Sequence, residues 1–320
     1  MSFNPKIIFS EEEKHEISRM LRYIDFRNSQ QKITDDIDKT NIVATTIAAL
    51  RLSGYDYNEE QLLRMINDDN ITSYDAIRVR NYYFIVTQIL SNNIEAIVDE
   101  LLIISFYNKI YNNSPQQHAL PSNNRSIYIQ PDLSEVVEWF LIECRKQKTH
   151  PLIISAAFIY EFVARDTLPM GKDEISHLLS LSLLQQQRAS WISIYTPCRA
   201  MTADILTYHR TLKGRENIGN NISQWVIYWI KQVYEAAQQA VSTHAPTLPP
   251  ASTAKKTAVN NRQRKILDFI EKNQPVKLAD ITAHLHKESI NTVKKDLIHL
   301  RQLGYITSDG VLKGTVYYRN

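Results

Sequence analysis

Glycine is scarce in this chain, at 7 of 320 residues. Nucleotide-binding β–α folds and glycine-rich β structures need glycine for tight turns and close backbone approach, so the composition argues against both. The sequence also has no run of about 18 apolar residues, and its first 21 residues lack the basic start and apolar core of a secretory signal. From these absences we expect a cytoplasmic protein with no membrane partner.

Cysteine is equally rare, with only Cys144 and Cys198 in the chain. Neither residue belongs to a CxxC pair, and neither has a pair of histidines nearby in the sequence. Metal-binding and disulfide-rich domains use closely and regularly spaced cysteines. The sequence therefore predicts two free thiols in a reducing compartment and no metal site.

Positive charge is concentrated at one end of the chain. Residues 259–320 hold 11 Lys and Arg against 6 Asp and Glu, whereas the rest of the chain holds 26 against 28. A local basic excess of this kind is typical of a segment that binds a polyanion.

A change of composition separates the two parts. The segment 242–258, STHAPTLPPASTAKKTA, is rich in Pro, Ser, Thr and Ala and has no apolar periodicity. Such a composition is typical of a linker. It divides the chain into a body, residues 1–241, and a small C-terminal domain, residues 259–320.

Apolar residues recur every three or four positions through most of the body, which predicts a mainly α fold. The expected helices lie in NEEQLLRMI, DAIRVRNYYFIVTQIL, EAIVDELLIISFYNKIY, LSEVVEWFLIECRKQ, HPLIISAAFIYEFVA, SHLLSLSLLQQQ, ILTYHRTL and ISQWVIYWIKQVYEAAQQAV. Asn58, Ser134 and Ser223 mark three helix starts, because Glu or Gln follows each within three residues. The alternation in NRSIYIQP predicts at most one edge ribbon.

The C-terminal domain shows three helical segments and then a hairpin. Helices are expected in NRQRKILDFIEKN and LADITAHLH, which Pro275 separates, and from Ser289 onward. The third helix carries a single apolar stripe, formed by Ile290, Val293, Leu297, Leu300 and Leu303. Two short β runs flank Asp309-Gly310, a strong hairpin signal. This order of elements is typical of a winged helix-turn-helix domain.

Burial of that stripe would leave polar residues of the third helix facing outward. These residues are Asn291, Thr292, Lys294, Lys295 and His299. The N-terminal half of such a helix contacts base edges and phosphates of double-stranded DNA, and Lys313, Arg262 and Arg264 are expected to contact the flanking backbone. The alternatives are a solvated face, or a winged helix used for dimerisation or protein contact.

The body resembles a known family in several segments that follow one another in the same order. THPLIISAAFIYEFV is similar to the helix that precedes the active loop of Fic-domain proteins, which usually reads close to HPLIxAAxxHYEFV. VRNYYFIVTQIL and ILTYHRTLKGRENIGNNISQWVIYWIKQVYEAA resemble two further family helices. The likeness covers about residues 42–240, and some members of the family also carry a C-terminal winged helix. It implies a Fic-type helical bundle.

The family generally transfers AMP from ATP to a protein hydroxyl through the loop HxFx(D/E)GNGRxxR. In that loop the His accepts the proton of the attacking hydroxyl, and the acidic residue holds Mg²⁺ against the phosphates. The Gly-Asn-Gly backbone and the following helix N-terminus bind phosphate oxygens, and the Arg neutralises them. The resemblance therefore implies ATP and Mg²⁺ as cofactors only if this loop works as it does in active members.

This chain departs from the loop pattern at almost every position. The matching positions are Asp166, Leu168, Met170, Gly171, Lys172, Asp173, Glu174 and His177. Gly171 alone retains the family residue. Asp166 stands at the His position and is a weaker base, since its reference pKa is about 3.9 against about 6.5 for His. Met170 replaces the metal-binding acid.

The change at Glu174 has the largest electrostatic effect, because it stands where the family has an Arg. An attraction to phosphate of about 4 kcal/mol at 4 Å becomes a repulsion of similar size when the effective dielectric constant is about 20. Lys172 restores one positive charge without the forked geometry of a guanidinium. We therefore predict that the loop does not bind ATP·Mg in the family's manner and that no catalytic residue remains.

A second family segment is altered in the same sense. Many members carry an inhibitory helix, (S/T)xxxE(G/N), whose Glu pairs with the loop Arg. ALRLSG aligns with it, with Ala49 in place of Ser, Ser53 in place of Glu, and Gly54 retained. Both halves of the control pair are then absent together.

Several polar residues of the body have simpler interpretations. His150 precedes a proline at a helix start, which predicts a capping or packing residue. His177 is expected to be exposed or locally paired. The acidic residues Asp166, Asp173 and Glu174 are expected to be solvated, with cation binding as the alternative.

Three hypotheses follow from the sequence. The first is a catalytically degenerate Fic-fold protein that acts as a DNA-binding regulator through its winged helix. Such a protein is expected to form a homodimer. The second is an active AMP- or phosphoryl-transferase that uses Asp166 as base and Lys172 for phosphate. The third is an interaction module whose tail binds a target protein.

Overall fold

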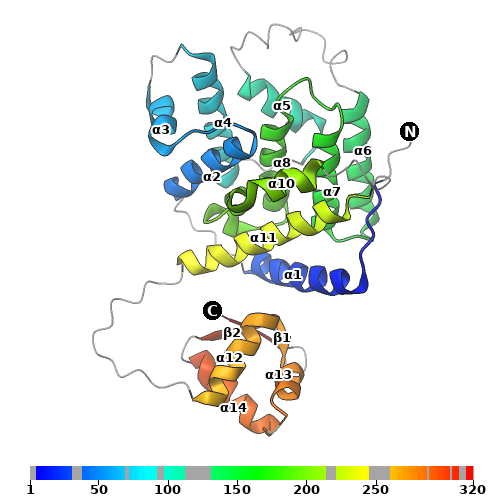
Figure 1. The fold of residues 1–320 in the computed structure, drawn as a ribbon, viewed down its shortest axis with the longest axis vertical. Helices are drawn as coiled ribbons and strands as arrows, with labels where there is room; N and C mark the ends of the chain where they lie inside the picture. The colour runs from blue at the N-terminus through cyan, green and yellow to red at the C-terminus, as the bar shows by residue number, and fades with distance from the viewer. Residues whose placement is uncertain are drawn as a thin grey trace.

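The structure of the protein is a computed structural model. It describes residues 5–30, 38–68, 72–91, 97–111, 131–213, 221–244, 260–286, 288–302, 305–309 and 315–319. The chain is mainly helical, as predicted, with strands only in its C-terminal unit (Figure 1) among these residues. None of the described helices combines the length and the apolarity needed to cross a bilayer.

Helices of different length make up the body. They are α1 (Glu11–Ser29), α2 (Lys39–Leu52), α3 (Glu59–Asn67), α4 (Tyr74–Leu90), α5 (Glu100–Ile110), α6 (Pro131–Lys146), α7 (Pro151–Ala164), α8 (Lys172–Gln186), η2 (Ser190–Ser193), α9 (Pro197–Met201), η3 (Thr202–Asp204), α10 (Ile205–Lys213) and α11 (Ser223–His244). Figure 1 shows α8 in the middle of this bundle, with α11 and α1 side by side at its lower edge.

Helix α8 is the centre of the core. Every residue from Ile175 to Leu184 is buried, and the helix packs against α7, α4, α5 and α2. A helix that is buried on all sides needs apolar or small side chains around its whole circumference, and leucine and serine supply them here. Because α8 is fixed in the core, the loop that precedes it is anchored where α8 begins.

The structure corrects three helix boundaries expected from the sequence. Helix α5 starts at Glu100, where Asp99 caps it, so the expected helix EAIVDELLIISFYNKIY begins too early. Helix α6 starts at Pro131 and contains Ser134, which was expected to be its start. Helix α11 runs to His244, so residues 242–244 of the expected linker are helical.

Helix α1 was not expected. Its start is a capping box, in which Ser10 and Glu13 each accept a hydrogen bond from the other's backbone N–H. Its buried face, which includes Ile17, Leu21 and Ile24, packs mainly on α11. The helix was overlooked because its first turn and its exposed face are strongly charged, although the cap and the apolar spacing were both present in the sequence.

The C-terminal unit contains three helices and a small sheet. Its elements are α12 (Asn261–Asn273), β1 (Val276–Lys277), α13 (Leu278–His284), α14 (Ile290–Gln302), β2 (Ile306–Asp309) and β3 (Val316–Arg319). The sheet is antiparallel in the order β1-β3-β2, with Val276 opposite Tyr317 and Ile306 opposite Arg319. The strand β1 was not expected, because two residues are too few to show alternation.

A separate apolar cluster stabilises this unit. It includes Ile266, Ile270, Val293, Leu297 and Leu300. The apolar stripe of α14 is thus confirmed at Val293, Leu297 and Leu300. The stripe begins one turn later than predicted, because Ile290 at the first turn is 54% exposed.

Several sequence predictions lie outside the described residues. They include residues 124–130 of the ribbon in NRSIYIQP, residues 245–258 of the linker, the stripe residue Leu303 and the turn residue Gly310.

Candidate functional site

The loop between α7 and α8 is positioned by defined ends on both sides. His150 caps α7, since its Nδ1 accepts from the Leu152 N–H at 3.2 Å and its Nε2 contacts Asp25, which confirms its capping role. Gly171 is the N-cap of α8 and has a φ of 72°, a left-handed conformation that favours glycine. The loop therefore ends at a buried helix whose first N–H groups point toward Gly171.

Tyr111, the residue that follows α5, covers this helix end. A Cβ built on Gly171 would lie 2.0 Å from the Tyr111 Oη and 2.8 Å from two carbons of its ring. Tyr111 is fully buried, and its hydroxyl has no hydrogen-bond partner among the described residues. The space beside Gly171, where an anion would meet the helix N-terminus, is thus filled by an aromatic ring.

A buried ion pair lies one turn further along α8. The Arg78 Nη1 donates to the Glu174 Oε1 at 3.2 Å and to the Tyr55 hydroxyl at 2.6 Å, and both charged side chains are almost fully buried. Burial raises the pKa of Glu174, and the positive charge of Arg78 opposes this effect. The Tyr82 hydroxyl donates to the Glu174 carbonyl oxygen at 3.2 Å. Glu174 is consequently a neutralised structural residue.

The expected acidic cluster is not formed. Asp166 is exposed, with its backbone N–H 3.3 Å from an Asp132 oxygen, whereas Glu174 is turned into the core against Arg78. The prediction of a solvated Glu174 is therefore wrong, because α4 supplies a buried cation. No group of His, Cys, Asp and Glu in the described part of the chain has the geometry to hold a metal ion.

The remaining loop positions have structural contacts. Leu168 is 6% exposed and belongs to the core. Met170 is partly buried against the same core. The Lys172 Nζ donates to the Arg165 carbonyl oxygen at 2.6 Å, so this ammonium caps the C-terminal end of α7.

His177 is buried inside the body. Its exposed fraction is 3%, and its Nε2 lies 3.4 Å from the Tyr208 hydroxyl. Burial, aided by the charge of His209, lowers the pKa of His177 to about 3. The expectation of local pairing is confirmed and that of exposure is wrong. A neutral histidine here supplies no positive charge to the start of α8.

The segment that the sequence analysis aligned with the inhibitory helix ends beside the Arg78–Glu174 ion pair. Ala49 is fully buried in α2, and the Ser53 hydroxyl donates to the Ala49 carbonyl oxygen at 2.9 Å. Gly54 has a φ of 92° and follows the helix end, where a left-handed residue is common. Tyr55, the next residue, reaches Arg78, so the end of α2 is joined to the start of α8 through Tyr55, Arg78 and Glu174.

Sequence reasoning missed Arg78, Tyr111 and Tyr55. One signal was available for Arg78, which stands four positions before Tyr82, one of the buried apolar residues of α4. A cation on the buried face of a helix needs a buried partner. Nothing local in the sequence indicated Tyr111, since its contact with Gly171 joins residues 60 positions apart.

The outer surface of α14 carries several of the residues expected to contact DNA. Asn291, Lys294 and Lys295 are exposed. Neither lysine has an ion-pair partner within the described part of the chain. Arg264, on α12, is exposed as well.

Three other expected contacts are engaged within the unit. Arg262 forms ion pairs with Asp296 and Glu288, and His299 is half-buried with its Nδ1 3.2 Å from the Gln263 Nε2. Thr292 is half-buried near the start of α14, and its hydroxyl lies 2.8 Å from that of Ser289. Lys313 lies outside the described residues.

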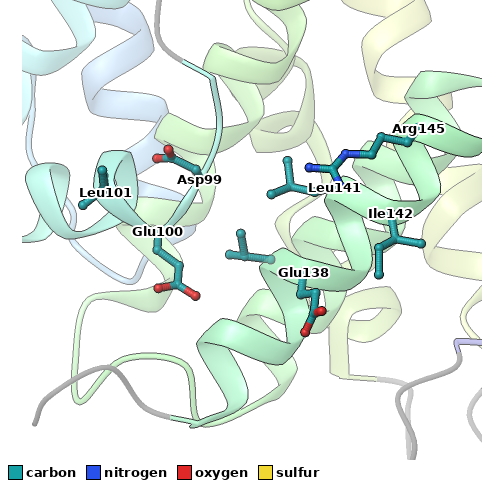
Figure 2. Close-up of a pocket in the computed structure, with 8 residues that line it drawn as sticks. Asp99, Glu100, Leu101, Glu138, Leu141, Ile142 and Arg145 are labelled. Carbon is teal, nitrogen blue, oxygen red and sulfur yellow. The ribbon is translucent and has the colours of Figure 1, made fainter. Parts of the chain in front are cut away.

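Two surface pockets lie away from the α7–α8 loop. One, of about 270 Å³, is bounded by α2 and by Tyr195, Arg199 and Thr202. The other, of about 460 Å³, lies between α5 and α6 (Figure 2). Its lining residues are Asp99, Glu100, Leu101, Val137, Glu138, Leu141, Ile142 and Arg145. Four of these residues are apolar, three are acidic and one, Arg145, is basic.

Comparison with known proteins identifies the fold. No family model matches the sequence, and a search of curated proteins finds no significant match. Among solved structures, a Fic family protein from Desulfovibrio desulfuricans is similar over 99% of this chain and 98% of its own, with a TM-score of 0.57 and 13% identity. A Fic domain containing signaling protein from Bacteroides thetaiotaomicron covers 72% of this chain and 96% of its own, with a TM-score of 0.50 and 13% identity. The chain thus has the mainly helical fold of Fic family proteins.

Proposed function

We propose that this protein is a Fic-fold regulator that has lost nucleotidyl transfer and binds double-stranded DNA through a C-terminal winged helix. The observation that carries the proposal is the surface of α14, on which Asn291, Lys294 and Lys295 are exposed while the apolar stripe packs inward. Three helices with a three-stranded antiparallel sheet support the interpretation as a winged helix. In such domains the third helix enters the major groove.

The proposed contacts differ in what they contribute. The two lysines and Arg264 supply phosphate contacts, which give affinity and salt dependence without sequence preference. Asn291 is in the first turn of α14, and we assign its amide to contact with an adenine edge. Arg262 is excluded from the proposed surface, because Asp296 and Glu288 neutralise it.

The loss of transfer chemistry is supported by the α7–α8 loop. The ring of Tyr111 fills the space beside Gly171, and Glu174, which is paired with Arg78 in the core, offers no cation to a phosphate. Lys172 is directed to the carbonyl oxygen of Arg165. We therefore propose that this site uses neither ATP nor Mg²⁺ as a cofactor.

DNA binding is tested by fluorescence anisotropy with labelled duplexes at 50 mM and 200 mM salt. We expect binding whose logarithmic salt slope becomes shallower by about 0.9 for each phosphate contact removed, so by nearly two in the Lys294→Ala/Lys295→Ala double variant. The matched control is Lys109→Ala/Lys231→Ala, which removes two exposed lysines from the body. No binding by the wild-type chain, or equal slopes in both double variants, would remove the proposal.

Loss of transfer is tested with ATP labelled at the α- or γ-phosphate, Mg²⁺ or Mn²⁺, and cell lysate. We expect no label on protein above the background of a sample without the chain. Label that disappears in Asp166→Ala would instead support the transferase hypothesis.

The pocket between α5 and α6 favours a second candidate function, protein contact. Leu101 and Ile142 are exposed apolar residues, at 67% and 40%, on opposite sides of the pocket, and Asp99, Glu100 and Glu138 lie between them (Figure 2). Arg145 also lines the pocket, so acidic groups outnumber basic ones there. This charge pattern is complementary to a peptide with apolar side chains flanked by Lys or Arg. A dye-labelled amphipathic Leu/Lys peptide should bind in anisotropy titrations, and Glu100→Lys/Glu138→Lys should weaken its binding at least tenfold. Equal affinity of the peptide for the wild type and the double variant would exclude this pocket as its binding site.

A further inference from the structure

The two faces of strand β3 have different surroundings. Side chains alternate between the faces of a strand, so Val316 and Tyr318 share one face while Tyr317 points to the other. Tyr317 packs on the apolar cluster of the C-terminal unit. Tyr318 and Val316 belong instead to the apolar cluster of the body. Both faces of β3 are thus covered, one by each part of the protein.

Helix α1 covers the outer face of β3. The rings of Tyr318 and Phe26 are stacked, with centroids 3.5 Å apart and planes 9° from parallel, and the Tyr23 ring lies 6.4 Å from Tyr318. Tyr318 is 4% exposed and Phe26 is 6% exposed. Tyr23 is in turn held edge-on by Tyr234 of α11 at 5.0 Å. We name the set Tyr23, Phe26, Val316 and Tyr318 the aromatic latch.

The latch leaves α14 uncovered. Figure 1 shows the C-terminal unit below α1, with its sheet toward α1 and α14 on the side away from it. Asn291, Lys294 and Lys295 are exposed while the latch is closed. Docking through β3 therefore fixes an orientation of the unit without hiding the surface of α14.

We propose that α1 is a docking surface for the C-terminal unit and that the aromatic latch holds α14 facing away from the body. A single aromatic stack is sufficient for this role because the two parts are joined by residues 245–259. A covalent connection of this length gives an effective concentration on the order of millimolar, so a contact with only millimolar intrinsic affinity is already substantially occupied. The inference does not depend on whether α14 binds DNA.

The test is ¹⁵N relaxation of backbone amides in the full-length chain. In the wild type, amides of α12 and α14 should report the same rotational correlation time as those of the body. In Tyr318→Ser the value for α12 and α14 should fall by at least about twofold, because a small domain on a tether tumbles faster than the whole molecule. Phe26→Ser opens the latch from the opposite side and should give the same result.

Phe84→Ser is the matched control, since Phe84 is a half-exposed phenylalanine on α4 of the body that is not part of the latch. Unchanged amide shifts for the core of the unit would show that Tyr318→Ser leaves it folded. Should the unit tumble independently in the wild type, or stay coupled to the body in both latch variants, the proposal is wrong.

Discussion

Arg78 is a buried cation whose charge is balanced by a residue 96 positions away. Its guanidinium lies 4.0 Å from the Tyr55 ring centroid and bonds to Glu174, so it joins the end of α2 to the start of α8. Its pKa is raised even though burial acts against it, because the Tyr55 hydroxyl and the charge of Glu174 favour the cation. Removal of Arg78 would leave the Glu174 carboxylate buried without its cation, which costs far more than loss of a surface pair. Arg78 itself has a second, more exposed partner in Asp75, whose Oδ1 lies 3.7 Å from its Nη2.

Arg78→Met should therefore lower the free energy of unfolding of the body by about 3–5 kcal/mol. Urea unfolding followed by tryptophan fluorescence measures this, since all four tryptophans lie in the body. Arg78→Met/Glu174→Leu should regain most of the loss, because no charge is then left unpaired. A double variant as unstable as the single one would contradict the assignment of this ion pair.

His177 makes the stability of the body depend on pH in a defined window. Between its folded pKa of about 3 and the ordinary value of 6.5, the unfolded chain binds a proton at this residue and the folded chain does not. Stability due to His177 is therefore complete above about pH 6.5 and is lost as the pH falls, by at most about 1.4 kcal/mol per pH unit.

Urea unfolding of His177→Gln at pH 7, 6, 5 and 4 tests this. The variant should lose less stability on acidification than the wild type, while His15→Gln, which removes an exposed histidine of α1, should follow the wild type. Parallel pH profiles for all three chains would show that His177 is protonated in the folded state.

At the scale of the elements, helix caps decide where several helices start. Asn260 and Gln263 form a capping box at α12, in which the backbone N–H of Gln263 donates to the Asn260 Oδ1 at 2.8 Å. The C-terminal unit has few core residues, so a single cap is a large part of its stability.

Asn260→Ala should destabilise the unit by about 1 kcal/mol. Amide hydrogen exchange in α12 should become faster by about fivefold, which is that free energy expressed as an opening equilibrium. The adjacent Asn261→Ala removes an exposed side chain without a capping role and should leave the exchange rates unchanged. Similar rates in both variants would mean that the box does not stabilise α12.

At the scale of the whole molecule, two apolar clusters lie in one chain. The larger contains α8 and the helices around it, and the smaller contains the inner faces of α12, α13 and α14. The aromatic latch connects them through Tyr318, which belongs to the larger cluster. Separate cores unfold separately when the contact between them is small.

Calorimetry should accordingly show two transitions. Ile270→Ala, in the smaller cluster, should lower the free energy of unfolding of the C-terminal unit by about 2–5 kcal/mol and leave the other transition in place. Leu178→Ala, in α8, should do the reverse. One transition that shifts as a whole in both variants would show that the two parts unfold together.

Local patterns were sufficient for much of the fold. The apolar spacing in residues 74–90 and 151–164 predicted α4 and α7, and that of α14 predicted Val293, Leu297 and Leu300 as its inner face. The proposed surface of α14 was partly predictable for the same reason, since a buried stripe determines which residues face outward. The ion pairs of Arg262 were not predictable, because Asp296 and Glu288 reach it from other elements.

The α7–α8 loop shows the same limit more sharply. The resemblance to Fic-domain proteins predicted that Asp166, Met170 and Glu174 differ from the family's loop. It gave no account of what occupies the site instead. Tyr111 and Arg78 come from α4 and the end of α5, and a side chain's direction across such a distance depends on how the helices pack.

The order of amino acids by itself thus determined the helical periods and the basic C-terminal part, because each depends on residue type or on spacing within a few turns. Only the tertiary structure decided that Glu174 is neutralised by Arg78, that Tyr111 covers Gly171, and that Tyr318 stacks on Phe26. Each of these contacts joins segments distant in the chain, and their geometry exists only once both segments are packed against a common core.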